Sequence, residues 1–206
     1  MSAKFIYFDL GNVILYFSHE RMCRQMAAVA GVTPEKVRDV LFTGDIKTQF
    51  ELGQTSATEC YEAFCQKLDV RPDRAALERA GNDIFDLNVS ILPLIVQLEA
   101  AGYRLGILSN ICQNHWKWVC DGRFGLLPDV FEVHALSYQI QAMKPDPKIY
   151  IAAAELAGVS PSEIFFLDDI EGHVLAARAA GFDAVQYTTT RVLGETMRKR
   201  GIRSNF

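Results

Sequence analysis

The residues best able to do chemistry stand directly after short apolar runs of the chain. Asp9 follows one run, Ser109-Asn110 follows a second, and Asp168-Asp169 follows a third. Lys144 lies in the loop region after a further run. These residues are spread over most of the sequence, so only a fold that aligns the ends of the runs brings them together.

Three carboxylates in one place would repel one another and any anionic substrate. They become reasonable ligands around a hard cation, and a set of oxygen ligands favours Mg²⁺. Lys144 adds a second positive charge, while Ser109 and Asn110 add a hydroxyl and an amide. Cation, ammonium, hydroxyl and amide together match the oxygens of a phosphoryl group. One carboxylate then remains to attack phosphorus as a nucleophile.

Five apolar runs are expected to form the strands that position these residues. They are residues 5–8, 105–108, 130–133, 164–167 and 184–187. Their almost continuous hydrophobicity is typical of a parallel sheet with helices on both faces. In such sheets ligands bind outside the carboxyl ends of the strands, so the polar residues should meet at one edge. The sequence therefore predicts a doubly wound, Rossmann-like α/β core.

Helix signals fill most of the remaining chain. Asp146 is a good N-cap before Pro147, and Gly158 is a good stop for the run 149–157. The segment from about Phe17 to about Asp86 shows helix signals alone, among them a capping box at Ser56-x-x-Glu59. We therefore expect a core of residues 1–16 and 88–206, with an all-helical cap inserted at 17–87.

Composition excludes several classes of protein. Of the 206 residues 50% are hydrophobic and 22% charged, and 21 basic residues face 25 acidic ones. The short basic tail around Arg198–Arg200 is better explained as a solvated helix end than as a nucleic-acid surface. No apolar stretch reaches the about 18 residues of a membrane span. Five cysteines without a Cys-x-x-Cys pair, and no signal-peptide pattern, favour a cytoplasmic protein.

Four motifs in this order resemble those of the haloacid dehalogenase superfamily. They are Phe8-Asp9-Leu10-Gly11-Asn12-Val13, Leu108-Ser109-Asn110, Lys144-Pro145 and Leu167-Asp168-Asp169. Each motif alone is weak, but the ordered set extends over nearly the whole chain. The sequence looks closest to the branch that contains sugar-1-phosphate phosphatases, in which Asp-Leu-Gly-Asn-Val is a familiar first motif.

The resemblance implies a Mg²⁺-dependent phosphatase that acts on a small phosphorylated metabolite. It implies that Asp9 is both nucleophile and metal ligand. The Gly11 carbonyl and Asp169 would be further ligands, and Asp168 would bind the metal directly or through water. Ser109, Asn110 and Lys144 would hold the phosphoryl oxygens, and Lys144 would also offset the charge around Asp9.

Gly11 departs from the family's usual pattern. Most phosphatases of the family carry a second aspartate two residues after the nucleophile, where it protonates the leaving oxygen and activates water. Glycine has no side chain for either task, and the loss of a general acid costs ~10²–10⁴ in rate. We therefore expect a preference for good leaving groups, such as anomeric, acyl or aryl oxygens. A plain alternative is that the loop needs glycine for its backbone freedom.

Four further residues are weaker candidates for substrate contacts. His115 and Trp116 follow the second motif, while His19 and Lys47 lie in the inserted segment. Packing explains the aromatic residues at least as well, and exposed lysines are common. His173, near the acidic pair, is better explained as a residue that orients its loop.

Two other functions remain open from the sequence. A 2-haloacid dehalogenase would use the same aspartate on carbon without a metal, and would release chloride from chloropropionate in the presence of a chelator. A phosphometabolite-binding protein could have lost turnover through Gly11, and would bind ligand without releasing phosphate. The sequence leaves the oligomeric state open.

Overall fold

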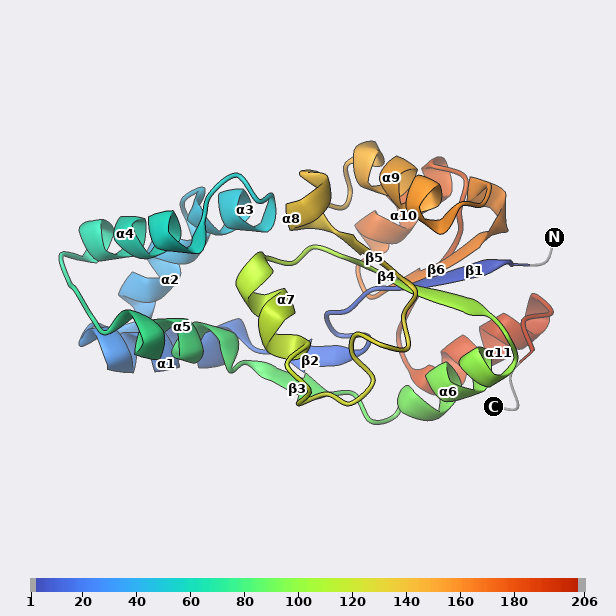
Figure 1. Cartoon of the computed structure of the whole chain (residues 1–206), viewed down its shortest axis with the longest axis horizontal. Helices are drawn as coiled ribbons and strands as arrows, with labels where there is room; N and C mark the ends of the chain where they lie inside the picture. Colours follow the sequence, from blue (N-terminus) through green and yellow to red (C-terminus); the bar gives the residue numbers. More distant parts are fainter. Residues whose placement is uncertain (1–2, 204–206) are drawn as a thin grey trace.

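Five parallel strands form the centre of the computed structural model, which describes residues 3–203 (Figure 1). In chain order they are β1 (Phe5–Phe8), β4 (Arg104–Ser109), β5 (Val133–Leu136), β6 (Ile164–Asp168) and β7 (Asp183–Gln186). Their order across the sheet is β5-β4-β1-β6-β7. The predicted doubly wound α/β fold is confirmed.

Helices cover both faces of this sheet, which explains why every residue of β1 is apolar and buried. Phe5 and Tyr7 pack on one face with α9 (Pro147–Ala157) and α10 (Glu171–Ala179). Ile6 and Phe8 pack on the other with α6 (Leu92–Ala100) and α11 (Thr190–Lys199). In Figure 1 the first helix pair lies above the sheet and the second below it.

The register of the strands brings the ends of β1, β4 and β6 level with one another. Phe8, the last residue of β1, pairs with Ile107 on one side and with Leu167 on the other. Asp9 continues the pairing, because its backbone N–H donates to the Leu167 carbonyl at 2.9 Å. Asp9 and Asp168 are therefore the next neighbours across this edge of the sheet.

The predicted helix signals act as expected. The Asp146 side chain accepts from the Lys148 N–H at the start of α9, and Gly158 ends that helix in the left-handed conformation with φ 65°. The capping box of Ser56 and Glu59 is present at the start of α4 (Ala57–Leu68). Two short helical segments, α8 (Ser137–Ile140) and the 3₁₀ turn η1 (Pro161–Glu163), complete this part of the chain.

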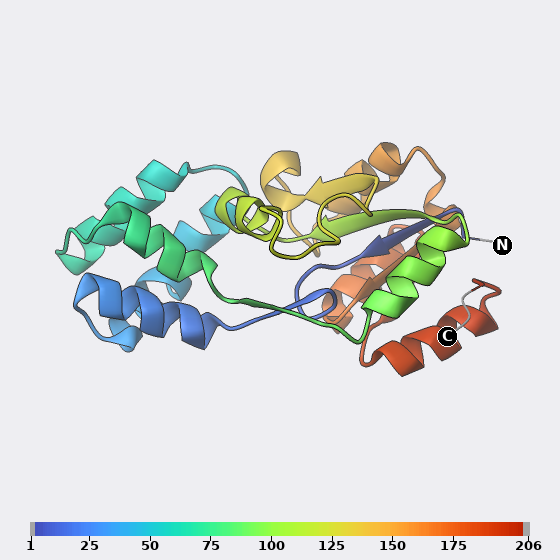
Figure 2. The ribbon, with the colours of Figure 1, turned by 60° about the horizontal axis from the view of Figure 1, so that its bottom comes forward.

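The inserted segment contains five helices that lie to one side of the sheet (Figures 1 and 2). Besides α4 they are α1 (His19–Ala30), α2 (Pro34–Phe42), α3 (Ile46–Glu51) and α5 (Arg74–Asn82). They have a hydrophobic core of their own, which includes Met22, Val37, Phe64 and Leu77. One helix of the other part, α7 (Gln113–Val119), packs against α5.

A two-stranded antiparallel ribbon joins the helical segment to the sheet. Its strands are β2 (Leu15–Phe17) and β3 (Phe85–Leu87), and Leu15 pairs with Leu87. The expectation of helices alone from Phe17 to Asp86 was therefore wrong at both ends. Strands of three residues are too short to show the alternation of apolar and polar residues that marks a strand. The two strands also lie at opposite ends of the inserted segment, so no local pattern indicates their pairing.

The third predicted strand was also misplaced. Residues 130–132 lie outside any strand, and the strand begins at Val133. The apolar residues at 130 and 131 serve packing instead, with the Phe131 ring 5.9 Å from that of Phe8. Since β5 is an edge strand, its true sequence is only half buried, which weakens its apolar signal.

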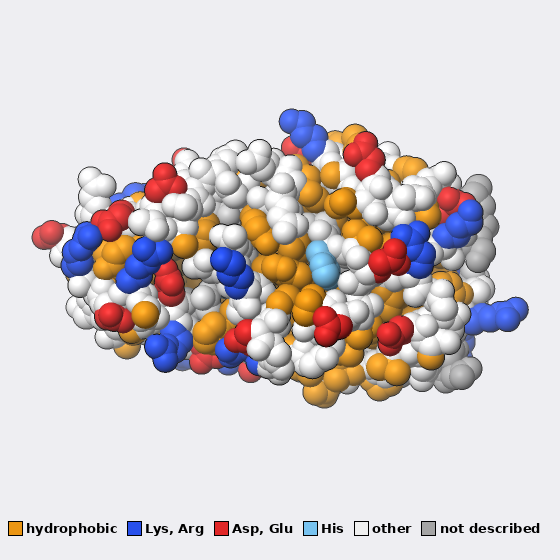
Figure 3. Space-filling view, viewed as in Figure 1, with side chains coloured by type: hydrophobic (Ala, Val, Ile, Leu, Met, Phe, Trp, Pro, Cys, Tyr) orange, Lys and Arg blue, Asp and Glu red, His pale blue; other side chains and the backbone are white. Residues whose placement is uncertain are grey.

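Surface charge shows no concentration of one sign on the face in Figure 3, where basic and acidic side chains are intermixed. The five cysteines are all free thiols. Within residues 3–203, no helix combines the length and the apolar character needed to cross a membrane.

Candidate active site

A buried lysine joins two of the predicted carboxylates at the end of the sheet. Lys144 Nζ lies 2.8 Å from Asp9 Oδ1 and 2.6 Å from Asp168 Oδ2. It also donates to the Leu108 carbonyl at 2.9 Å, at the end of β4. All three charged side chains are at least nine-tenths buried. The ammonium group therefore holds the ends of β1, β4 and β6 together.

Asn110 holds the backbone of Lys144 in place. Its Nδ2 donates to the Lys144 carbonyl at 2.9 Å, and its Oδ1 accepts from the Lys144 N–H at 2.7 Å. Asn110 was expected to contact substrate, whereas its amide is engaged with the loop of Lys144. Ser109, which ends β4, is buried and faces the same cavity as Asp9.

Both carboxylate oxygens of Asp168 are occupied by groups of the protein. Oδ1 accepts from the Ile170 N–H at 2.8 Å, and His173 Nδ1 lies 3.1 Å from each oxygen. With Lys144 on Oδ2, this carboxylate is fully enclosed. Asp168 therefore acts as the anchor of Lys144 and of the first turn of α10.

The loop after β1 brings Asp169 beside Asp9. Asn12 adopts the left-handed conformation with φ 55°, and its Nδ2 donates to Asp169 Oδ2 at 3.0 Å. Asp9, Asp168 and Asp169 each offer one carboxylate oxygen within 4.8 Å of the others. Within the described residues, Asp9 Oδ2 and Asp169 Oδ1 accept no hydrogen bond. This donor set of oxygens fits a hard divalent cation such as Mg²⁺.

The charges of this cluster are unevenly balanced. Burial raises the pKa of Asp9 to about 6, with Lys144 acting against the rise and Asp168 adding to it. Burial also disfavours the ionised form of Asp168, but Lys144 and His173 outweigh it and lower the pKa to about 2. Lys144 thus pairs with both carboxylates, and of the two it is Asp9 whose ionised form burial disfavours more. A cation beside Asp9 would favour its ionised form.

A cavity of about 290 Å³ opens over these groups. Its floor includes residues from all four predicted motifs, namely Asp9, Gly11, Ser109, Asn110, Lys144 and Asp169. Its roof comes from the helical segment and from α7, with His19, Lys47, Glu51 and His115. All but two of the residues predicted from sequence line this cavity: Asp168 lies behind its wall in contact with Lys144, and Trp116 lies elsewhere.

Trp116 packs into the core instead of facing the cavity. Its ring lies 4.9 Å from that of His134, and it packs against the hydrophobic core that underlies the sheet. Consecutive helical residues point about 100° apart, and here His115 lines the cavity whereas Trp116 is turned away from it. The expectation of a Trp116 substrate contact is therefore corrected.

The roof residues have partners of their own. The His19 ring stacks between Phe17 and Phe42, with centroids 4.9 and 4.7 Å away. Burial, with the nearby charge of Lys47, lowers the pKa of His19 to about 4. Lys47 forms an ion pair with Glu51 at 2.7 Å. His19 is therefore neutral at ordinary pH.

Two residues of the site escaped the sequence analysis. Phe17 lies over Gly11, and a β-carbon on Gly11 would come within 2.8 Å of the Phe17 ring. No local pattern marks this contact, because it depends on the path of β2. Glu51 could have been found from its spacing of four residues from Lys47, which is typical of a helical ion pair.

Comparison with known proteins decides the family. A family model described as haloacid dehalogenase-like hydrolase matches residues 6–181. The chain belongs to this family. Among haloacid dehalogenase-like hydrolases it is similar to Phosphatase MT3486 of Mycobacterium tuberculosis, with 35% identity over 213 residues, 89% of this chain and 87% of that protein.

Two further hydrolases match over similar shares of their length. D-ribitol-5-phosphate phosphatase of Bacteroides thetaiotaomicron is 24% identical over 89% of this chain and 91% of its own. The HAD family enzyme BT-2542 of the same organism, solved with magnesium and inorganic phosphate, superposes with TM-score 0.82 and 26% identity, covering 91% and 95% of the two chains. Some matches are partial, and the chain spans about half the length (49%) of YhcW of Bacillus subtilis.

Proposed function

We propose that this haloacid dehalogenase-like hydrolase is a cytoplasmic, Mg²⁺-dependent phosphatase for small phosphate monoesters. One observation carries the proposal: Asp9 meets Lys144, Asp168 and Asp169 at one edge of the sheet, with an oxygen of Asp9 left to react. The names of the relatives support it, since two are phosphatases and a third was solved with magnesium and phosphate.

Asp9, Asp169 and the Gly11 carbonyl are the proposed metal ligands. The contacts of Asp168 favour a role behind the metal site, reaching it through water, because Lys144, His173 and Ile170 already use its oxygens. When bound, Mg²⁺ supplies positive charge for the phosphoryl oxygens. Lys144 and Ser109 supply the remaining donors.

In the proposed first step one carboxylate oxygen of Asp9 attacks phosphorus, while the other would serve as the metal ligand. A bond forms between the attacking oxygen and phosphorus, and the ester P–O bond breaks on the opposite side. Lys144 keeps Asp9 oriented and offsets its charge. Water then attacks the aspartyl-phosphate, which releases inorganic phosphate and restores the Asp9 carboxylate.

The leaving oxygen receives no proton from position 11, which favours esters of weakly basic alcohols. Sugar 1-phosphates belong to this class, as do acyl and aryl phosphates. The first motif, Asp9-Leu10-Gly11-Asn12-Val13, supports the sugar-1-phosphate branch. A rate that stayed constant across alkyl and aryl phosphates would contradict this preference.

The helical segment would act as a cap in this scheme. We propose a core of residues 1–16 and 88–206 and a cap of residues 17–87, which excludes water and selects the leaving group. The position of His19, Lys47 and Glu51 over the cavity supports this division.

Release of inorganic phosphate tests the proposed function. The panel contains sugar, nucleotide and aryl phosphates, each with Mg²⁺ and with chelator. We expect turnover of at least one ester, lost on chelation and lost in Asp9→Asn. The matched control is Asp73→Asn, which changes an N-cap aspartate of α5 to another good N-cap and should keep full activity. Turnover that persists in Asp9→Asn, or none from any ester, rejects the proposal.

A further inference from the structure

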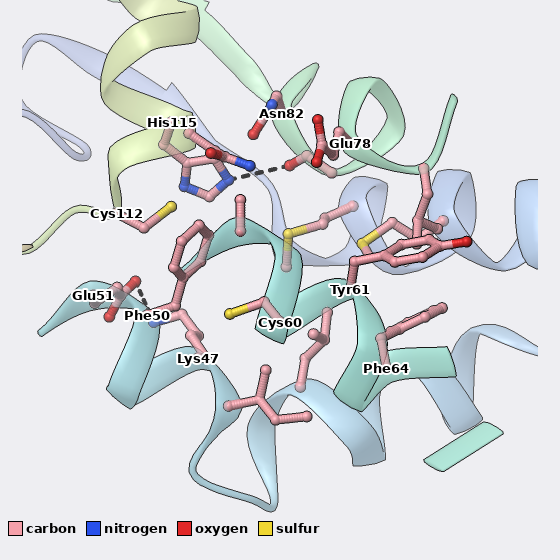
Figure 4. Close-up of a pocket in the computed structure, with 18 residues that line it drawn as sticks. Lys47, Phe50, Glu51, Cys60, Tyr61, Phe64, Glu78, Asn82, Cys112 and His115 are labelled. Atoms are coloured by element: carbon pink, nitrogen blue, oxygen red, sulfur yellow. Dashed lines mark hydrogen bonds and ion pairs between the residues drawn. The ribbon is translucent and has the colours of Figure 1, made fainter. Parts of the chain in front are cut away.

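A second cavity of about 130 Å³ lies inside the helical segment (Figure 4). Its walls come from α1, α2, α3, α4, α5 and the start of α7. Most side chains in these walls are apolar, and they include Met22, Met26, Phe50, Cys60, Phe64 and Leu77. We call this space the apolar chamber.

The apolar chamber adjoins the cavity over Asp9. Lys47, Glu51 and His115 line both spaces, and we call the boundary that they form between the two cavities the neck. In Figure 4 these three side chains lie along the left side of the chamber, with the Phe50 ring between His115 and the pair of Lys47 and Glu51. A molecule that reacts at Asp9 could therefore extend past the neck into the chamber.

The charged groups in the chamber wall are already paired. Lys47 binds Glu51 at 2.7 Å, and Glu78 accepts from Arg74 at 2.8 Å. His115 Nε2 lies 3.2 Å from the Gly81 carbonyl. An occupant therefore meets mainly carbon and sulfur, and a hydroxyl placed there would lose its hydrogen bonds to water.

We propose that the apolar chamber binds a hydrocarbon tail on the leaving group of the phosphate ester. The volume agrees with this occupant, because an apolar protein cavity of about 150 Å³ binds benzene. The phosphate stays at Asp9 and the tail passes the neck, so among esters of weakly basic alcohols the chamber selects those with an apolar end, such as aryl phosphates, over the sugar 1-phosphates that the first motif alone favours. This inference rests on the proposed phosphatase function and narrows its substrates.

The test compares phenyl phosphate with its 4-methyl, 4-ethyl and 4-propyl derivatives. Their leaving groups have similar basicity, so differences report binding of the tail. We expect kcat/KM to rise about threefold to fourfold for each methylene that the chamber buries. Phosphate release from phenyl phosphate with no rise along the series overturns the chamber and leaves the proposed function intact.

Two variants connect the effect to the chamber. Cys60→Leu fills it, because the Cys60 sulfur points into the space in Figure 4, and should abolish the rise along the series. Cys120→Leu is the matched control, since Cys120 is also half-buried but lies outside both cavities, and should keep the rise. A rise that survives in Cys60→Leu contradicts the inference.

Binding of 4-propylphenol gives a readout without turnover. Calorimetric titration should show binding to the wild type and to Cys120→Leu, and at least tenfold weaker binding to Cys60→Leu. Thermal unfolding of each variant checks that it is folded. Equal affinity of the three proteins for 4-propylphenol, or no binding to any of them, overturns the inference. This readout does not need turnover, so it decides about the chamber even if no ester is hydrolysed and the proposed function fails.

Discussion

The side-chain amide of Asn110 pairs with both backbone polar groups of Lys144, at 2.9 and 2.7 Å. The Asn110 amide thus forms with Lys144 the two backbone hydrogen bonds that a residue of a neighbouring strand would otherwise form. Lys144 is thereby fixed at its backbone by Asn110 and at its ammonium group by Asp9 and Asp168.

Asn110→Ala should therefore lower kcat without removing any group that contacts the reacting atoms. Leaving the backbone groups of Lys144 unpaired costs ~1–3 kcal/mol. If that free energy falls on the transition state, kcat drops about tenfold for each 1.36 kcal/mol. Steady-state phosphate release measures it, with Gln66→Ala, an exposed amide on α4 outside both cavities, as the control. An unchanged kcat would show that the pairing does not serve Lys144.

Lys144→Met should destabilise the fold as well as stop turnover. The substitution leaves Asp9 and Asp168 buried beside each other without their shared cation, and breaking a buried pair costs ~3–5 kcal/mol. Urea unfolding in the absence of metal gives the change in the free energy of unfolding. Added Mg²⁺ should restore part of it by binding near the carboxylates that have lost the ammonium group. A loss no larger than that of a surface lysine variant, such as Lys4→Met, would contradict the buried pair.

Gly11→Asp alone should not supply the missing general acid. The new β-carbon would lie 2.8 Å from the Phe17 ring, which must move before the aspartate can face the site. Gly11→Asp combined with Phe17→Ala provides the space. The double variant should hydrolyse an alkyl phosphate at least tenfold faster than Phe17→Ala alone, within the ~10²–10⁴ that general acids contribute. A single variant as fast as the double one would show that Phe17 is no obstacle.

His19→Phe should change how stability depends on pH. The pKa of His19 is about 4 in the folded protein and 6.5 in its unperturbed state, so the unfolded chain binds the proton first as pH falls. The contribution of neutral His19 is complete above pH 6.5 and is lost between pH 6.5 and about 4. His19→Phe keeps an aromatic ring between Phe17 and Phe42 but cannot take up a proton.

Urea unfolding of both proteins at pH 7 and pH 4.5 measures this effect. The free energy of unfolding of the wild type, taken relative to His19→Phe, should decrease at the lower pH. The shifts of Asp9 and Asp168 are common to both proteins and cancel in the comparison. A difference that is equal at the two pH values would contradict a depressed pKa for His19.

The sheet and the floor of the site could be predicted because they depend on local signals. Buried strands of a doubly covered sheet are apolar at every position, as in Phe5–Phe8, and polar residues directly after them must lie at one edge. Edge strand β5 has a weaker apolar signal, so the sequence predicts a strand at the more apolar run 130–133 instead. The ribbon of β2 and β3 depends on pairing between distant residues, which no window of sequence displays.

The exact contacts of the site were harder to predict for the same reason. A sequence gives the residue type of Asn110 but not that its amide faces the backbone of a loop 34 residues later. Phe17 over Gly11 and the tail-sized space beside Cys60 arise from tertiary packing. Trp116 fails as a candidate because the rotation of α7 decides which of two adjacent aromatic residues faces inward.

The pairing of Leu15 with Leu87 brings together the point where the chain leaves the sheet for the inserted helices and the point where it returns. The segment between Phe17 and Phe85 is thus connected to the sheet through this ribbon alone. A different insert of any length with closely spaced ends could replace it without altering the strand order that carries Asp9 and Lys144. During evolution, replacement of this insert would change the substrate that is accepted while the reacting groups stayed unchanged.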